Sequence, residues 1–470
     1  ADRGAQSGRE EYWFHAVVTT YETLLLEERA IGAVPWQYLV VDEAHRLKNP
    51  KSRLRTSIER LAYEQLALLT GTPVQNSAAE LFSLLQLLEP ERLASASEAE
   101  GGFGEMREAE EVRRMQALLQ PLMLRRVKED VVSDEIPCKE ETIIWVELTG
   151  EQKVLYRAIL DKNVSLLAQA DGAGKGPLMN NIHMNLRKLC NHPRLLQRED
   201  APLPSDPAAA IAALTDASGK MVLLHKLLPK LRAEGRKVLI FSQMTRMLDL
   251  IEDYCHVSRF PFERLDGSVT GGKRQASIDR FQNGGNADAF LFLLSTRSGG
   301  VGVNLTAADT VVLVDSAWNP QNDAQAMARC HRIGQTKPVH VYRLCTKDTY
   351  EMHMLNTANH KLGLEHAVMR SAGSGYDAKP MTATGFAKSE KLDESTVRQR
   401  ATQIERLLRT GAQLLLSEEQ DAQAKAYGES SIEQILDQYA TTRTVGGEEG
   451  ARPTAEGGHG HGGGGASGGD

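Results

Sequence analysis

The sequence predicts an α/β protein built from two parallel-sheet domains. Short runs rich in leucine and β-branched residues, each followed directly by small, polar or charged residues, occur at least six times, and stretches with helical periodicity lie between them. Such alternation is typical of a parallel sheet covered by helices. The alternation stops between about residues 97 and 220, where acidic and Gly/Pro-rich loops flank a long helical pattern at 151–168. This pause predicts a domain boundary.

Each predicted strand leads into a segment with polar side chains. The strands are expected at 15–20, 38–43, 66–72, 237–243, 290–297, 310–316 and 339–344. Helical periodicity marks 78–88 and 111–120. Ligands of open α/β sheets bind beyond the carboxyl ends of the strands. The polar residues that this sequence places there are Asp42, Thr70, Ser242, Ser295 and Asp315.

Composition limits the class of protein. With 470 residues, 41% of them hydrophobic, and no apolar run long enough to cross a bilayer, the chain can bury two ordinary cores. The net charge of -7 argues against nucleic-acid binding through overall charge, so any site for a polyanion must be local. The five cysteines are scattered and never form a C-x-x-C pair, which indicates reduced thiols inside a cell. The first residues show neither an initiator Met nor a signal peptide, as in a trimmed or partial chain.

The segment "YLVVDEAHRLKNP", residues 38–50, ends an apolar run in two adjacent carboxylates. A carboxylate at a strand end can hold Mg²⁺ through water while the next one orients an attacking water, and phosphoryl transfer from ATP needs both tasks. Asp42 would hold the metal and Glu43 would orient the water. In the alternative interpretation, Asp42 only caps the helix that follows.

Further segments follow in the order of superfamily-two helicase motifs. They are "ALLTGTPVQNS" (67–77), "RLDGSVT" (264–270), "STRSGGVGVNLTAADT" (295–310) and "WNPQNDAQAMARCHRIGQ" (318–335). Together with "LMLRRVKEDV" and "LRKLCNHPRLL", they make the chain resemble the chromatin-remodelling ATPases of the sucrose-non-fermenting type. The segments "PCKEETIIWVELTGEQKVLYRAIL" and "KLGLEHAVM" are similar to the chromodomain-helicase-DNA-binding subgroup. The resemblance covers about residues 12–440.

The resemblance implies two RecA-like lobes that hold ATP between them and bind DNA across both. The implied domains are the C-terminal part of an incomplete first lobe at 1–135, an inter-lobe helical insertion at 136–219, the second lobe at 220–370 and a helical bridge or regulatory extension at 371–445. A Gly/His-rich tail at 446–470 is expected to be disordered.

The resemblance also implies roles for individual residues. Arg329 and Arg332, three apart on an expected helix, match arginine fingers, whose fixed planar charge stabilises the transition state. The other matches are nucleotide contacts at Gly302 and Gln325, and a relay between nucleotide and DNA at His45, Thr70 and Thr72. Without the surrounding motifs, a solvated helix face and an ordinary turn would be the better interpretations of the arginines and of "TGTP".

A translocase must bind every DNA sequence alike, so its contacts should be to phosphates. The residues that match such positions are Thr19, Thr20, Ser295, Thr296, Arg297 and Trp318. For Trp318, a place in the core and a place at the DNA are equally good interpretations.

The P-loop of this family, G-x-x-x-x-G-K-[ST], does not occur in the sequence. The segment "DGAGKGP", residues 171–177, fails the pattern because Gly176 replaces the Ser or Thr. The chain as given is therefore expected not to hydrolyse ATP without that loop.

Two hypotheses from different classes remain. The first is an enzyme that uses ATP and Mg²⁺ to move along duplex DNA and remodel nucleosomes in the nucleus. Its partners would be DNA, histones and subunits of a remodelling complex, with no membrane. The second is a DNA- or nucleosome-binding fragment without ATP turnover. The first is favoured because Asp42, Glu43, Arg329 and Arg332 are all present. An RNA helicase would fit "DEAH" but neither "LRKLCNHP" nor "HRIGQ".

Overall fold

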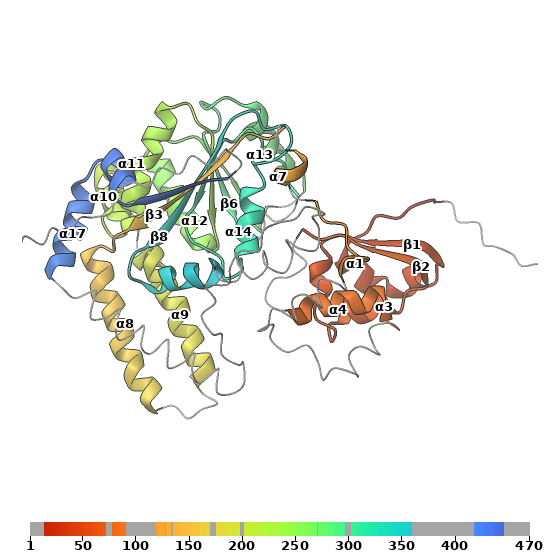
Figure 1. Cartoon of the computed structure of the whole chain (residues 1–470). Helices are drawn as coiled ribbons and strands as arrows, with labels where there is room; N and C mark the ends of the chain where they lie inside the picture. Colours follow the sequence, from red (N-terminus) through yellow and green to blue (C-terminus); the bar gives the residue numbers. More distant parts are fainter. Residues whose placement is uncertain are drawn as a thin grey trace, which may run out of the picture. The chain divides into compact units, whose positions relative to one another are not determined.

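The computed structural model of the chain forms two compact units (Figure 1). It describes residues 14–71, 78–90, 119–126, 128–132, 135–169, 175–197, 202–269, 271–296, 302–359 and 418–445. The first unit contains the described residues up to Arg126 together with 317–324 and 348–359, and the second unit contains the others. The expected tail at 446–470 and most of the expected helix at 111–120 lie outside the described residues.

The first unit contains a two-stranded parallel sheet of β1 (Trp36–Val41) and β2 (Tyr63–Leu68), paired so that Val41 lies opposite Leu68. Its helices are α1 (Tyr21–Leu26), α2 (Glu28–Gly32), the 3-10 helix η1 (Ala44–Leu47), α3 (Arg53–Glu59) and α4 (Ala78–Leu88). Apolar side chains from these elements form one small core, made of Leu24, Val41, Ala44, Leu47, Ile58, Leu61, Leu84 and Leu87.

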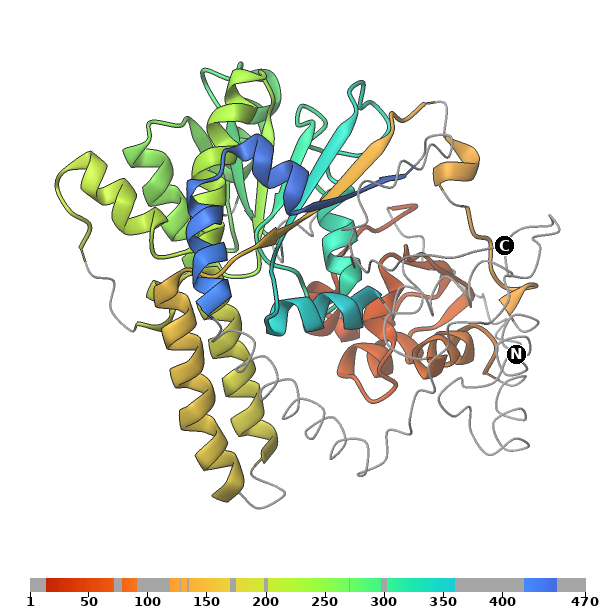
Figure 2. The same ribbon diagram turned by 60° about the vertical axis from the view of Figure 1, so that its left-hand side comes forward.

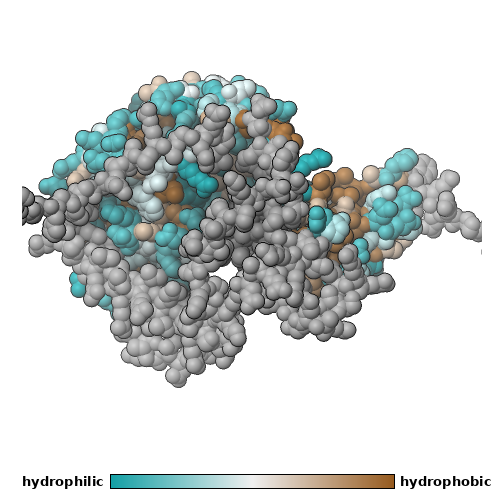
Figure 3. Space-filling model, viewed as in Figure 1, coloured by the Kyte–Doolittle hydropathy of each residue, from teal (hydrophilic) through white to brown (hydrophobic). Residues whose placement is uncertain are grey.

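In the sheet of the first unit, side chains on one face pack on this core and described side chains on the other face are exposed. Tyr38 and Val40 point away from the core and are 66% and 59% exposed, because side chains alternate between the two faces of a strand. The space-filling view also shows hydrophobic surface on this unit (Figure 3).

The strand predicted at 15–20 is wrong. Residues 16–20 belong to neither strand nor helix, and Val18 is 98% exposed. A β-branched run becomes a strand only where a neighbouring strand accepts its backbone hydrogen bonds, and the sequence pattern alone does not reveal that partner.

The second unit contains a seven-stranded sheet with the order β5-β6-β4-β7-β8-β3-β9, parallel except for β9. The strands are β3 (Lys139–Val146), β4 (Val238–Ser242), β5 (Phe262–Leu265), β6 (Leu291–Ser295), β7 (Thr310–Leu313), β8 (Val339–Thr346) and β9 (Ala440–Val445). All residues of β4, β6 and β7 are buried, which explains their continuous apolar sequences. The predicted α/β class with parallel sheets is confirmed.

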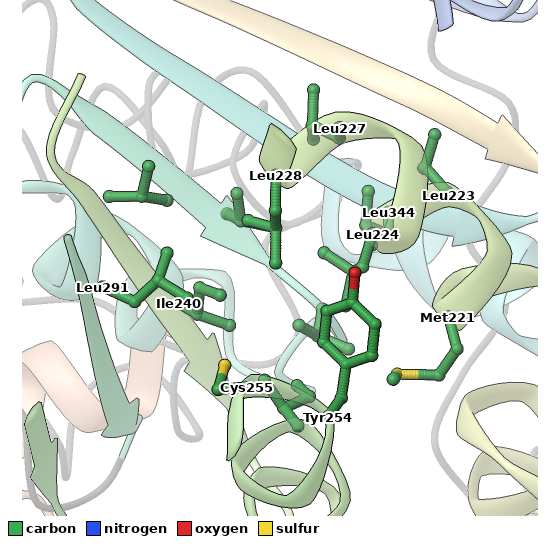
Figure 4. Close-up of a cluster of buried hydrophobic side chains, with 14 of the residues drawn as sticks. Met221, Leu223, Leu224, Leu227, Leu228, Ile240, Tyr254, Cys255, Leu291 and Leu344 are labelled. Atoms are coloured by element: carbon green, nitrogen blue, oxygen red, sulfur yellow. The ribbon is translucent and has the colours of Figure 1, made fainter. Parts of the chain in front are cut away.

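Helices surround this sheet. They are α7 (Lys128–Val131), α8 (Gly150–Gln169), α9 (Lys175–Asn191), η3 (Pro193–Leu196), α10 (Pro207–Thr215), α11 (Gly219–Ala233), α12 (Thr245–Val257), α13 (Gly272–Asn283), α17 (Glu418–Glu429) and α18 (Ile432–Gln438). Helix α14 (Pro320–Met327) has residues 320–324 in the first unit and residues 325–327 in the second. The largest core lies where leucines of α11 meet Ile240, Leu291 and Tyr254 (Figure 4). Helices α8 and α9 run side by side in both ribbon views (Figure 2). No helix in the described ranges is long and apolar enough to cross a membrane.

Two strands lie where only helices were expected. β3 falls within 136–219 and pairs with β8, so this region contributes a strand to the second sheet. β9 falls within 371–445 and pairs antiparallel with β3. Each strand exists because of a partner far away in the sequence, and helical periodicity in the flanking segments concealed both.

The segment at 418–445 is anchored to the second unit. Tyr427, Ile432 and Ile435 belong to its main core. The ammonium group of Lys226 donates to the carbonyl oxygens of Gly428 and Ser430 at 2.7 and 2.6 Å, which satisfies acceptors at the end of α17. These contacts fix the end of α17 and the residues that follow it to α11.

A buried histidine follows α9. The Nδ1 atom of His192 accepts from the amide of Arg194 at 3.1 Å, so its proton is on Nε2, which lies 3.0 Å from the carbonyl oxygen of Leu214. Burial lowers the pKa of His192 from 6.5 to about 4. The folded chain therefore holds the neutral imidazole, whereas the unfolded chain binds a proton below pH 6.5.

We expect the stability of the second unit to be complete above pH 6.5 and to fall as the pH approaches 4, with His192 contributing about 2–3 kcal/mol to the loss. His192→Gln should reduce the difference in unfolding free energy between neutral and acidic pH by that amount. Denaturant unfolding at several pH values measures it, with His256→Gln at an exposed site as control. An unchanged pH dependence in His192→Gln would contradict the assignment.

Candidate functional site

The ends of β1 and β2 bring two polar turns together in the first unit. Asp42 and Glu43 follow β1, and Leu69 and Thr70 follow β2. Pairing continues past the strands, because the amide of Leu69 donates to the carbonyl of Val41 at 2.8 Å and the amide of Ala44 donates to the carbonyl of Leu69 at 2.9 Å. The two turns are thus held against each other by backbone hydrogen bonds.

Asp42 shapes its own turn. Its Oδ1 accepts from the amide of Glu43 at 2.8 Å, and the residue is exposed. The residue at the N-cap of η1 is Glu43, whose side chain forms no capping hydrogen bond. The structure therefore does not support the interpretation of Asp42 as a mere helix cap.

Glu43 adopts a left-handed backbone conformation, with φ of 49°. This region is unfavourable for a residue with a Cβ atom, by about 1–2 kcal/mol. Strain of this kind occurs preferentially at functional sites. The conformation directs the side chain of Glu43 to His45, with Oε2 lying 3.1 Å from Nδ1.

His45 lies between the two turns. Its Nδ1 is 3.1 Å from the carboxylate of Glu43 and 3.5 Å from the hydroxyl of Thr70. Burial lowers the pKa of His45, although the Glu43 carboxylate opposes this effect. A neutral imidazole that donates from Nδ1 to Glu43 satisfies both observations. Thr72, the third residue of the predicted relay, lies outside the described residues.

Helix α1 supports the turn from behind. The hydroxyl of Tyr21 donates to the carbonyl of Asp42, and the guanidinium of Arg46 lies 4.6 Å from the Tyr21 ring centre. Arg46 also pairs with Glu22 at 2.9 Å. The hydroxyl of Thr20 caps α1 by accepting from the amide of Thr23 at 3.1 Å, so this predicted DNA contact also has a structural role. Its neighbour Thr19 is exposed.

The donor set fits Mg²⁺ bound mostly by water. Asp42 offers an exposed carboxylate at a strand end, and Mg²⁺ prefers such hard oxygen ligands. In the described part of the chain, no group of three or more His, Cys, Asp or Glu residues could enclose a metal ion. Mg²⁺ typically binds through one or two carboxylates together with waters and phosphate oxygens, which agrees with this arrangement.

The predicted helix that carries both arginines is wrong. α14 ends at Met327, and Arg329 and Arg332 lie in the turns that follow. Arg329 is buried, whereas Arg332 is partly exposed. The two guanidinium groups therefore occupy different environments in the second unit. Gln325 lies on α14 itself.

A glutamine that the sequence analysis did not single out fixes these turns. The Nε2 atom of Gln335 donates to the carbonyl oxygens of Thr306, Ala308 and Cys330 at 3.1, 2.7 and 3.1 Å. It thereby joins the arginine-bearing turns to the segment that follows Gly302. The backbone of Gly302 is left-handed, with φ of 48°. The only sequence signal was its position after Gly334, in "HRIGQ".

The predicted DNA contacts lie in different environments. Ser295 and Thr296 are buried at the end of β6, where the amide of Thr296 donates to the carbonyl of Ser242 at 3.0 Å. Arg297 lies outside the described residues. Trp318 is 48% exposed and packs edge-on against Tyr350, with ring centres 5.8 Å apart, so it is not a core residue.

Two family models match the chain. The SNF2-related domain matches residues 5–195, and the helicase conserved C-terminal domain matches residues 219–334. The chain is 46% identical over 443 residues to human chromodomain-helicase-DNA-binding protein 7, with 92% of this chain and 14% of that protein covered. It is 47% identical over 443 residues to human chromodomain-helicase-DNA-binding protein 8, with 92% and 16% covered.

A third relative is the mouse chromodomain-helicase-DNA-binding protein 9, which is 47% identical over 446 residues, with 93% of this chain and 15% of that protein covered. The chain thus spans about a sixth of the length of these relatives.

The backbone strain at Glu43 predicts an unusual order of stabilities. Glu43→Gly and Glu43→Ala both remove the contact with His45, but only glycine relieves the left-handed conformation. We expect Glu43→Gly to be more stable than Glu43→Ala by about 1 kcal/mol, measured by denaturant unfolding. At Glu28, a helical position in α2, the same pair should show the reverse order. Equal stabilities of the two Glu43 variants would argue against strain.

Proposed function

The chain belongs to the SNF2-related family of helicase-like chromatin remodellers, and we propose on that basis that it is part of an ATP-driven motor that moves along duplex DNA and repositions nucleosomes. The observation that carries the proposal is the contact between the Asp42–Glu43 turn and the Leu69–Thr70 turn. This contact brings the carboxylates of Asp42 and Glu43 and the hydroxyl of Thr70 to one edge of a parallel sheet, where ligands of such sheets bind.

Asp42 and Glu43 would divide the work at the nucleotide. Asp42 would hold Mg²⁺, mainly through water, and the ion would supply charge neutralisation at the phosphate oxygens. Glu43 would orient the attacking water and accept its proton. Its left-handed backbone and its contact with His45 fix the carboxylate in one orientation.

His45 would couple the state of the nucleotide site to the residues that bind DNA. The imidazole contacts Glu43 and also lies within 3.5 Å of Thr70. A shift of Glu43 on nucleotide binding would therefore move the hydrogen bond that His45 offers, and Thr70 and Thr72 would transmit the change along the "TGTP" segment.

The second unit would supply fixed positive charge. Arg329 and Arg332 carry permanently charged guanidinium groups that suit a developing charge on phosphate oxygens. Gln325 and Gly302 would contact the nucleotide from the same unit. Gln335 supports this role, because its amide holds the arginine-bearing turns against the segment after Gly302.

Binding to DNA would use phosphates rather than bases. The proposed contacts are Thr19, Thr20, Ser295, Thr296, Arg297 and Trp318. Since the chain has a net charge of -7, these contacts must act locally. The proposed site of action is the nucleus, with nucleosomes, histones and subunits of a remodelling complex as partners.

One observation favours a second function, binding to DNA or nucleosomes without ATP turnover. The sequence contains no G-x-x-x-x-G-K-[ST] pattern, which holds the phosphates of ATP in this family. Hydrolysis by the purified chain that duplex DNA stimulates and Glu43→Gln abolishes would exclude this second function.

Catalysis is tested in a version of the chain preceded by a P-loop segment of the same family. Glu43→Gln should leave ATP binding near wild type and lower DNA-stimulated turnover about 100-fold or more, because a positioned base is lost. Arg332→Ala should lower turnover comparably without unfolding the second unit, and Arg157→Ala on α8 is the control. Near-normal turnover in Glu43→Gln, or unfolding in Arg332→Ala, would overturn the respective role.

Binding to DNA is tested on the chain itself. We expect two short duplexes of unrelated sequence to bind with nearly equal affinity, and we expect that affinity to fall steeply with salt, because counterions are released from phosphates. Fluorescence anisotropy across a salt series measures both. Selective binding to one duplex, or insensitivity to salt, would contradict phosphate recognition.

A further inference from the structure

A buried polar cluster joins four elements of the second unit. It consists of Asn191 at the end of α9, Lys220 at the start of α11, Ser242 at the end of β4 and Asp315 just after β7, and we call it the Asn191 cluster. None of the four is more than 2% exposed. Charged and polar side chains are rarely buried so completely unless they are paired.

The amide of Asn191 lies at the centre of this cluster. Its Oδ1 accepts from the ammonium of Lys220 at 2.8 Å, and its Nδ2 donates to Oδ2 of Asp315 at 2.8 Å. The ammonium of Lys220 also donates to the carbonyl of Val314 at 2.8 Å. Each end of the amide thus meets a group of the matching kind, a cation at the oxygen and a carboxylate at the nitrogen.

From Asp315 the hydrogen bonds continue to the end of β6. Oδ1 of Asp315 accepts from the amide of Gln243 at 2.7 Å, and Oδ2 lies 3.3 Å from the hydroxyl of Ser242. The carbonyl of Ser242 in turn accepts from the amide of Thr296 at 3.0 Å. A continuous path therefore leads from α9 to a proposed DNA contact.

Helix α9 also holds the turn after β7 at a second point. The guanidinium of Arg187, one turn before Asn191, donates to the carbonyl of Ser316 at 3.0 Å. The carbonyl of Asn191 itself accepts from the hydroxyl of Ser218, which begins α11. The end of α9 is thus tied to the strand ends on one side and to α11 on the other.

Burying such a polar cluster in a core costs free energy. Burial raises the pKa of Asp315, and the charge of Lys220 with the donors around the carboxylate opposes that rise. Apolar residues of similar volume can often replace buried charged groups without loss of stability. What the polar cluster adds is a single defined geometry, since each donor must meet its acceptor.

We propose that Asn191 is a positioning residue for DNA binding. Through Asp315 and Ser242 it sets the backbone at Thr296 and at the turn of residues 314–316, so that the strand ends meet phosphates in one arrangement. The proposal rests on the proposed function, because Thr296 is a DNA contact only if the chain binds DNA. It also makes the α8–α9 pair a support of the DNA surface.

The first test is duplex affinity of Asn191→Asp by fluorescence anisotropy. The variant keeps the size of the side chain but turns an oxygen toward Oδ2 of Asp315, where the wild type has a donor. We expect the dissociation constant to rise about 10-fold. Asn286→Asp is a matched control, because it adds the same charge in the same unit at a site where the side-chain amide donates to the carbonyl of Arg236 at 3.1 Å. Its affinity should stay within about twofold of the wild type.

A double-mutant cycle separates positioning from general loosening. If Asn191 acts through Thr296, the losses of affinity in Asn191→Asp and Thr296→Ala should be less than additive, whereas Asn286→Asp and Thr296→Ala should add. Full additivity of the first pair would overturn the proposal. Equal affinities of Asn191→Asp and Asn286→Asp would overturn it as well.

A milder variant tests the proposal in case Asn191→Asp does not fold. Ser242→Ala removes only the hydroxyl from the path, and we expect its dissociation constant to rise about threefold with a cooperative unfolding transition retained. If Asn191→Asp does not fold, unchanged affinity in Ser242→Ala overturns the proposal. If neither variant folds, the cluster is a folding element and the proposal is wrong. If the wild type binds no duplex, the proposed function fails first, which is a different outcome.

Discussion

The hydrogen bonds that join Val41, Leu69 and Ala44 extend the pairing of β1 and β2 beyond the strands themselves. Because parallel strands all end at the same edge, this pairing is what brings the Asp42–Glu43 turn and the Leu69–Thr70 turn into contact, although Thr70 lies 27 positions after Glu43 along the sequence. The strained backbone of Glu43, the neutral imidazole of His45 and the exposed carboxylate of Asp42 all depend on it. A shift of one strand by a single residue would turn these side chains to the opposite faces.

In the second unit, long polar side chains satisfy carbonyl groups that secondary structure leaves unpaired. Lys226 does so at the end of α17, Gln335 does so between two loops, and Lys220 does so at Val314. His192 does the same for Leu214 while staying neutral. An unpaired carbonyl in a core is costly, so each of these side chains fixes the path of a loop as well as stabilising it.

Much of the sheet could be predicted from the sequence, because buried parallel strands have continuous apolar runs. Strands at β4, β6, β7 and β8 lie within a few residues of their predicted positions. Positions that depend on a distant partner could not be predicted in this way. The run at 15–20 lacks a neighbouring strand, while β3 and β9 acquire one from far along the chain.

In the candidate site, too, some contacts follow from local sequence patterns and others depend on residues far away in the sequence. The meeting of the Asp42–Glu43 turn with the Leu69–Thr70 turn follows from strand ends alone. The turns around Arg329 depend on the amide of Gln335, and the proposed role of Asn191 depends on Asp315, 124 residues later. Local patterns do not encode such contacts. They reveal the types of residue at a site but not the bonds that hold them.

The antiparallel strand β9 has a consequence for how the chain is made. β3 ends at residue 146 and β9 begins at residue 440, so the ribosome must add nearly three hundred residues before the outer edge of β3 can be covered. At typical rates of synthesis this takes about 15–60 seconds. During that time the backbone of an apolar strand, "TIIWV", is open to other chains, which makes nascent molecules vulnerable to aggregation at this edge.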